Sequence, residues 1–298
     1  MPESERIRLS SKKGRGFSMV SSYVQVLKPL PSILLAYIGV GAAVIAGGGQ
    51  LEPRLWLVLA AVLAASAGAN GLTNYLDRDI DARMQRTCWR ALPSRTIYPP
   101  EKALPLIIGL IIAGLALAWL LNPYVFLADA GGTLVAATWR KKLTCVFPQG
   151  ALASCAPVLM GWLAVSRSLS LELGLVCLLI AAWLPLHVWS VNITHRDDYR
   201  QAGLNYFPIN LEVKDSVKVL LAFAVALYAV SIGLYFAGSF GWLYLVLANI
   251  LGIGMVYAGT RLVSSRAASD VWRLFRLSSF PYLGLIFLAM CLDIWLKG

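Results

Sequence analysis

Long runs of apolar residues, separated by short polar segments, restrict how this chain can fold more than any other feature. About 20 apolar residues in a helix cross the hydrocarbon core of a bilayer. A backbone in lipid must satisfy its own hydrogen bonds, and unbroken apolar runs favour helices over a closed barrel. The sequence therefore predicts an all-α integral membrane protein with nine transmembrane helices, near residues 31–48, 54–75, 104–121, 123–139, 149–166, 171–193, 216–238, 241–262 and 278–296.

The distribution of positive charge orients these helices. If the N-terminus is cytoplasmic, only Arg54, Arg167 and Lys297 of the 26 Lys and Arg residues lie outside the cell. Cytoplasmic loops of membrane proteins carry such an excess of Lys and Arg. We therefore expect a multi-pass protein of the plasma (inner) membrane with a cytoplasmic N-terminus. The net charge of +11 then needs no nucleic acid partner.

The domain organisation predicted from composition is simple. Residues 1–25 are basic and polar, which predicts a flexible cytoplasmic tail, and residues 26–298 form one nine-helix domain. The first apolar run is too long for a signal peptide, so we expect an uncleaved helix. The five cysteines show no metal-binding spacing, and we assign them no chemistry.

A first polar stretch, residues 74–87, follows the second apolar run. If the helix continues through it, Asn74, Asp77 and Asp81 share one face, and Asp79 points the other way, beside Arg83. Carboxylate and amide oxygens suit Mg²⁺ that also holds substrate phosphates. The alternative is a solvated loop whose charges balance.

A second polar stretch, residues 192–200, follows the sixth apolar run on the same predicted side of the membrane. Helical spacing puts Asn192, His195 and Tyr199 on one face, and it does not decide whether Asp197 or Asp198 points inward. Two acidic helix ends, each followed by arginine, are suited to holding one diphosphate through Mg²⁺. Taken alone, His195 is equally consistent with a surface histidine.

Three further polar features lie near or within the apolar runs. Asp129 is an intramembrane carboxylate, which marks either a site or a neutral acid bonded to Thr133. The basic loop 139–144 is either a phosphate-binding segment or a plain cytoplasmic anchor. His187 is either a site residue or a packed, hydrogen-bonded histidine of the bundle.

Four segments in order resemble the UbiA superfamily of intramembrane prenyltransferases: residues 74–87, 139–162, 187–189 and 198–208. Within it the chain is most similar to the protoheme IX farnesyltransferases (heme O synthases). Some positions depart from that pattern, namely Thr73, Asp129 and 205–207. The sequence of residues 90–94 is closer to that of aromatic and quinone prenyltransferases.

This resemblance implies a nine-helix fold and Mg²⁺-dependent transfer of an isoprenyl group, with farnesyl diphosphate as the expected donor and heme b as acceptor, giving heme O. The implied metal ligands and catalytic residues are Asn74, Asp77, Asp81 and Asp198, with Asp197 as the alternate ligand. The implied substrate-binding residues are Arg86, Arg90, Lys141, Lys142, His187, Asn192, His195, Arg196 and Tyr199. A phenolic acceptor would need a base, for which His187, His195 and Asp129 are candidates.

Three other functions remain open at this point. The same mechanism could prenylate an aromatic or quinone precursor of the 4-hydroxybenzoate type. Two acidic helix ends around a cavity could also bind and move a cation in a transporter, although both lie at one face rather than near the midplane. The third alternative is a membrane scaffold without catalytic activity. Such a protein would not need two groups of carboxylates, each spaced to lie on one face of a helix.

Overall fold

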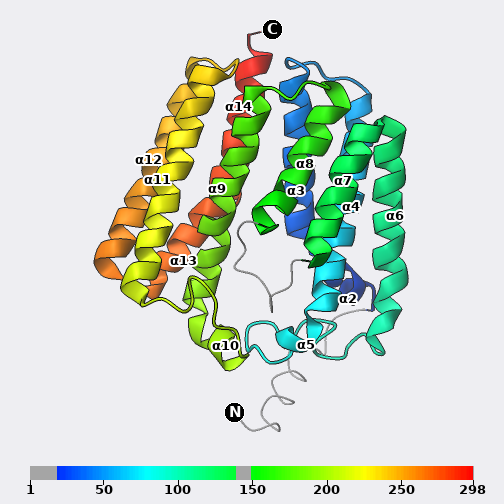
Figure 1. Cartoon of the computed structure of the whole chain (residues 1–298), viewed down its shortest axis with the longest axis vertical. Coiled ribbons are helices and arrows are strands. Elements are labelled where there is room, and N and C mark those ends of the chain that lie inside the picture. The colour runs from blue at the N-terminus through cyan, green and yellow to red at the C-terminus, as the bar shows by residue number, and fades with distance from the viewer. Residues whose placement is uncertain (1–18, 139–148, 298) are drawn as a thin grey trace.

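The computed structural model describes residues 19–138 and 149–297, and these parts of the chain form a helical bundle (Figure 1). Its long helices are α3 (Pro29–Ala46), α4 (Arg54–Leu76), α6 (Leu104–Leu121), α7 (Pro123–Thr138), α8 (Gln149–Val165), α9 (Leu171–Thr194), α11 (Val213–Ala237), α12 (Trp242–Ser265) and α14 (Leu285–Trp295). Shorter elements are α2 (Met19–Val26), α5 (Arg78–Asp81), η1 (Pro100–Ala103), α10 (Arg196–Gln201), α13 (Ala268–Leu277) and the π-helical η2 (Ser278–Gly284).

Each of the nine predicted spans overlaps a long helix. Within the described residues, seven helical segments are long and apolar enough to cross a membrane, and α8 is a shorter apolar helix. The prediction of an all-α, multi-pass membrane protein is confirmed. The count of nine crossings and the orientation of the N-terminus stay predictions.

The helix α2 occupies residues that the sequence assigned to the flexible tail. Its Ser22 and Val26 are buried, and the side chain of Gln25 accepts a hydrogen bond from the backbone N–H of Ala91 at 2.9 Å. Residues 19–25 are thus ordered against the loop that follows α5. The rest of the predicted tail lies outside the described residues.

Close helix contacts set the space around α8. A Cβ atom built on Gly161 of α8 would lie 1.8 Å from the carbonyl oxygen of Gly39 in α3. Small residues allow helix backbones to approach in this way in membrane proteins. The crossing fixes α8 against α3 and so places Pro157 and Met160 opposite α4.

The two polar stretches come together at one end of the bundle, where α5 and α10 lie side by side (Figure 1). The loop 82–99 is folded into this end, and its Met84, Thr87 and Ile97 are almost fully buried. Met84 packs with Tyr199 and Ile209, beyond α9 in the chain. Side chains of the loop therefore join two parts of the sequence that are more than 100 residues apart.

Candidate active site

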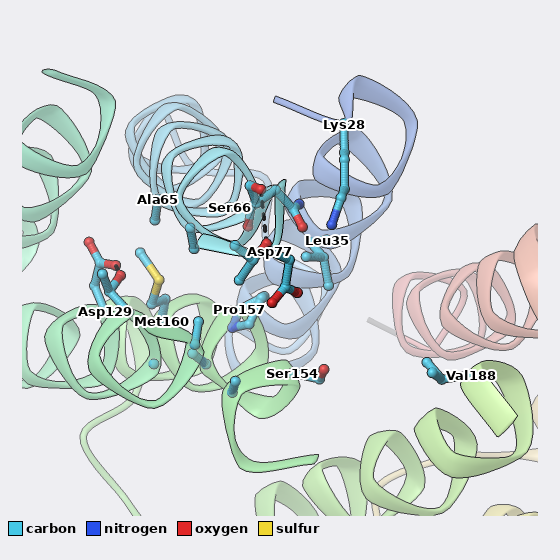
Figure 2. Close-up of a pocket in the computed structure, with 18 of the residues that line it drawn as sticks. Lys28, Leu35, Ala65, Ser66, Asp77, Asp129, Ser154, Pro157, Met160 and Val188 are labelled. Atoms are coloured by element: carbon cyan, nitrogen blue, oxygen red, sulfur yellow. Dashed lines mark hydrogen bonds between the residues drawn. The ribbon is translucent and has the colours of Figure 1, made fainter. Parts of the chain in front are cut away.

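A cavity of about 310 Å³ lies between α3, α4, α7, α8, α9 and α10 (Figure 2). Its apolar walls come from small and medium side chains, among them Leu35, Ala69, Pro157, Met160 and Val188. Ligand pockets in proteins usually have volumes of about 300–1,000 Å³. The cavity is thus of a size that suits a small organic ligand.

Polar groups gather at the part of the cavity near α5 and α10. They are Lys28, Asn70, Thr73, Asp77, Asn192, Tyr199 and Tyr206. Figure 2 shows the Lys28 ammonium and the Asp77 carboxylate both directed into the cavity. A cation, a carboxylate and amide groups around one space can bind an anion directly and a divalent metal beside it.

The phase of α4 explains which of its residues reach the cavity. Ser66, Asn70 and Thr73 lie on one face of this helix, and Asp77 continues that face at its end. Residues three, four and seven apart share a helical face. The polar groups that α4 contributes to the cavity therefore form one stripe along this helix.

The structure divides the predicted Asn74, Asp77 and Asp81 cluster. The helix α4 ends at Leu76 because Asp77 leaves the helical conformation (φ −92°, ψ 2°), and helical phase is lost before α5. Asp77 lines the main cavity, whereas Asn74 and Asp81 line a second, smaller one. The amide of Asn74 donates to the carbonyl of Val26 at 2.7 Å and so fixes the end of α2.

Asp81 is paired with Arg90. The side chain of Asp81 is 2 % exposed, and its Oδ2 lies 3.0 Å from Nη1 of Arg90. Its backbone carbonyl accepts a hydrogen bond from the hydroxyl of Thr87 at 3.0 Å. These contacts anchor the loop 82–99. The side chain of Asp79 is exposed, and its Oδ1 lies 3.9 Å from Nε of Arg78.

Asp198 joins the two polar stretches directly. Its Oδ1 accepts the backbone N–H of Gln85 at 2.6 Å, and its Oδ2 accepts that of Arg86 at 3.0 Å. Asp197 is exposed. Of the two aspartates left open by the sequence, Asp198 is the one turned toward the first polar stretch.

Arg86 and Tyr199 form a second link between the stretches. Nη2 of Arg86 donates to the Tyr199 hydroxyl at 3.3 Å, while its buried Nε has no hydrogen-bond partner among the residues described. Burial raises the pKa of Tyr199. An unused guanidinium N–H beside a neutral phenol is available to an anionic ligand.

Two other predicted ligand-binding residues, His187 and Arg196, make contacts within the protein. The ring of His187 stacks between Trp183 and Phe275, and its Nδ1 lies 3.0 Å from the Ser278 hydroxyl, as expected for a packed histidine. Arg196 donates through Nε to the carbonyl of Ile209 at 2.9 Å.

His195 ends α9 and lies against the ring of Trp272. Burial, with the nearby positive charge of Arg86, lowers the pKa of His195, and Asp198 opposes that shift. A neutral imidazole at this position can accept a proton or a hydrogen bond.

The donor atoms around the cavity fit Mg²⁺, although no three His, Cys, Asp or Glu side chains within 19–138 and 149–297 are close enough to form a metal cage. Mg²⁺ commonly keeps several waters and takes one or two carboxylates together with substrate phosphates. Asp77, with the amide oxygens of Asn70 and Asn192, supplies that kind of partial shell.

Sequence reasoning did not identify Lys28, Asn70 and Tyr206 as site residues. Asn70 could have been found, because it lies one and two helical turns before Thr73 and Asp77 on the same face. Lys28 directly precedes α3, and only the fold brings it to the cavity. Lys141 and Lys142 lie outside the described residues.

Known proteins are similar to this chain in sequence and in fold. Residues 33–283 match the model of the UbiA prenyltransferase family. A protoheme IX farnesyltransferase of Desulforudis audaxviator is 35% identical over 93% of this chain and 89% of its own length. One from Gloeobacter violaceus is 34% identical over 92% of each chain.

Solved structures agree in fold. A digeranylgeranylglyceryl phosphate synthase superposes with a TM-score of 0.74 at 19% identity, covering 93% of this chain and 98% of that one. A UbiA homolog from Archaeoglobus fulgidus bound to GPP and Mg²⁺ gives a TM-score of 0.67 at 17% identity, with 92% and 99% covered. These matches exclude the transporter and scaffold alternatives. The chain belongs to the UbiA prenyltransferase family and is a multi-pass membrane prenyltransferase.

Proposed function

We propose that this enzyme transfers a farnesyl group from farnesyl diphosphate to protoheme IX, giving heme O, in a reaction that requires Mg²⁺. The observation that carries the proposal is the similarity to protoheme IX farnesyltransferases over nearly the full length of both chains. The motif in residues 74–87 and the polar end of the cavity supply the groups that this chemistry needs.

The diphosphate is assigned to the polar end of the cavity. The Lys28 ammonium would donate to phosphate oxygens. Arg86, which is bonded to the cavity-lining Tyr199, would add the N–H of its unpaired Nε if its side chain turned into the cavity. Asp77 would hold Mg²⁺ together with the diphosphate, and the amides of Asn70 and Asn192 would complete the contacts. Bound there, the metal would neutralise the negative charge of the leaving group.

Asp81 and Asp198 have supporting positions in this proposal. Asp81 is already neutralised by Arg90, and Asp198 already accepts two backbone N–H groups. Both hold the loop that carries Arg86. Asp198 reaches a metal only if it gives up one of these bonds, so we assign Asp77 as the principal carboxylate ligand.

The apolar walls of the cavity would keep water away from the step in which the allylic C–O bond breaks. Breaking the allylic C–O bond creates a carbocation that water would capture. Leu35, Ala69, Pro157 and Val188 surround the space next to the diphosphate end and keep it apolar. The acceptor's carbon nucleophile, a vinyl carbon in heme b, would approach from this side.

Charge asymmetry supports a cytoplasmic active site in the plasma (inner) membrane. Arg78, Arg86, Arg90, Arg196 and Arg200 all lie in the segments that meet at the end of the bundle formed by α5 and α10. Cytoplasmic ends of membrane proteins are enriched in Lys and Arg. Water-soluble prenyl diphosphate and Mg²⁺ would then enter from the cytoplasm.

The test is product formation by the purified full-length protein in detergent with farnesyl diphosphate and Mg²⁺. One reaction contains heme b and another contains 4-hydroxybenzoate, each with and without EDTA. We expect a farnesylated heme that EDTA abolishes. A product that forms equally well in EDTA would contradict the metal requirement.

Prenylation of an aromatic precursor is the second candidate. The cavity volume of about 310 Å³ is at the lower end of the range for ligand sites, and a single ring fits beside a prenyl chain more readily than a porphyrin. An EDTA-sensitive product in the 4-hydroxybenzoate reaction alone would show that the acceptor is an aromatic acid rather than heme. Geranylgeranyl diphosphate in parallel reactions tests the donor length.

A further inference from the structure

Asp129 lies within α7, away from the metal and diphosphate groups. It is nine residues before Thr138, or about 13 Å along the helix. Its exposed fraction is only 2 %, yet it lines the main cavity. Figure 2 shows it on the side of the cavity away from Lys28. The cavity therefore has a second polar group, deep in the bundle.

The hydrogen bonding of Asp129 is incomplete. Its Oδ1 accepts from the Thr133 hydroxyl at 3.2 Å, but its buried Oδ2 has no partner among the residues that the structure describes. An ionised carboxylate without a partner is costly inside a membrane bundle. A protonated carboxyl group would still carry an O–H that needs an acceptor. In either state, Oδ2 lacks a group that a ligand in the cavity can supply.

The prenyl donor has no polar group that could form a hydrogen bond with Oδ2 of Asp129. An isoprenyl diphosphate is polar only at its diphosphate, which we assign to the Lys28 and Asp77 end. Its tail is hydrocarbon and would leave Oδ2 desolvated and without a hydrogen bond, which is unfavourable for a buried polar group. A ligand with a second polar group beyond an apolar body fits the cavity better.

We propose that Asp129, supported by Thr133, binds a carboxyl or hydroxyl group of the prenyl acceptor. This inference rests on the proposed function, because it takes the acceptor to be heme b or an aromatic acid. Both classes carry carboxyl groups, and such a group can donate to a carboxylate or share one proton with it. Asp129 then fixes the orientation of the acceptor's reacting carbon toward the diphosphate end.

The test is a cycle of equilibrium binding measurements on the full-length protein in detergent, which needs no turnover. Wild type and Asp129→Leu are titrated with heme b and with its dimethyl ester, and binding is followed by heme absorbance. The cycle isolates the pairwise contribution of the two groups. If wild type does not bind heme b, 4-hydroxybenzoate and its methyl ester replace them.

We expect esterification to weaken binding to wild type roughly 10- to 100-fold, as for loss of a hydrogen bond to a charged group, and to change binding to Asp129→Leu less than about twofold. Asp129→Asn replaces the carboxyl group with an amide, which has one acceptor oxygen and two N–H donors, and should recover part of the affinity lost in Asp129→Leu. Met160→Leu, which alters the same cavity without removing a polar group, is the matched control.

Three results would overturn the inference. They are an equal effect of esterification on wild type and Asp129→Leu, a change confined to the affinity for farnesyl diphosphate, and wild type that binds neither acceptor. Prenyl transfer is measured on the same samples. Wild type that shows the expected cycle without forming product would refute the proposed function and leave Asp129 as a ligand site.

Discussion

Both carboxylate oxygens of Asp198 are bound to the first polar stretch, and its Oδ2 accepts the backbone N–H of Arg86 at 3.0 Å. The two acidic segments are thus joined because a carboxylate of the second segment binds the backbone of the first. This arrangement holds Arg86, and with it the loop 82–99, beside Tyr199, which lines the cavity.

Asp198→Asn should loosen this loop. The amide keeps one acceptor oxygen and loses the charge, so about 1.5–3 kcal/mol of hydrogen bonding to a charged group is weakened. We expect lower thermal stability in detergent and a large loss of transfer activity. Asp197→Asn is the matched control, because Asp197 is exposed, and it should change neither quantity. Equal effects at both positions would contradict the assigned role.

Asp77→Ala should abolish prenyl transfer while the protein remains folded in the membrane. Asp77 is the carboxylate at the polar end of the cavity, and removing one group that stabilises developing charge typically lowers the rate by about 100-fold or more. Product formation is measured over a Mg²⁺ titration. Asp79→Ala, at a neighbouring exposed carboxylate, should retain activity. Retention of full activity in Asp77→Ala would rule out the proposed metal position.

Arg90→Ala should destabilise the protein. The side chain of Asp81 is buried, and the Arg90→Ala change removes a counter-ion that lies 3.0 Å from its carboxylate. Breaking one partner of a buried pair typically costs about 3–5 kcal/mol. The double change Asp81→Asn with Arg90→Ala removes the negative charge as well and should recover part of the thermal stability. If the double variant is as unstable as the sum of the single ones, the pair does not act as a unit.

Gly161→Ala should disturb the crossing of α3 and α8. The added Cβ would overlap the Gly39 carbonyl, so the helices must separate. Overpacking of this kind costs about 1–3 kcal/mol, and we expect it to lower thermal stability and activity together. Gly174→Ala in α9 meets open space and should leave both unchanged. A fully stable Gly161→Ala would show that the crossing is more adaptable than the contact implies.

The sequence predicted the helices well because bilayer thickness sets their length. The expected spans 54–75 and 171–193 differ from α4 (Arg54–Leu76) and α9 (Leu171–Thr194) by one residue at one end. The last predicted span, 278–296, covers η2 and α14 to within one residue. It begins in the π-helical η2 around Pro281, and a count of apolar residues does not reveal the irregular backbone there.

The candidate site was predicted in composition but not in arrangement. Helical spacing placed Asn74, Asp77 and Asp81 together, yet Asp77 lines the main cavity while Asn74 and Asp81 line the smaller one. The partners of Asp198 lie 112 and 113 residues earlier in the chain, and no local pattern specifies such contacts. Lys28 reaches the cavity for the same reason, through tertiary packing.

The continuous stripe from Ser66 to Asp77 has a consequence for chain length. Inserting or deleting one residue between them would rotate Asp77 by about 100° relative to Ser66 and turn it away from the cavity. An insertion in an exposed part of the loop after Asp81, around Arg95, would leave that angle unchanged. Changes in length that preserve function should therefore occur after the motif and be absent within the last three turns of α4.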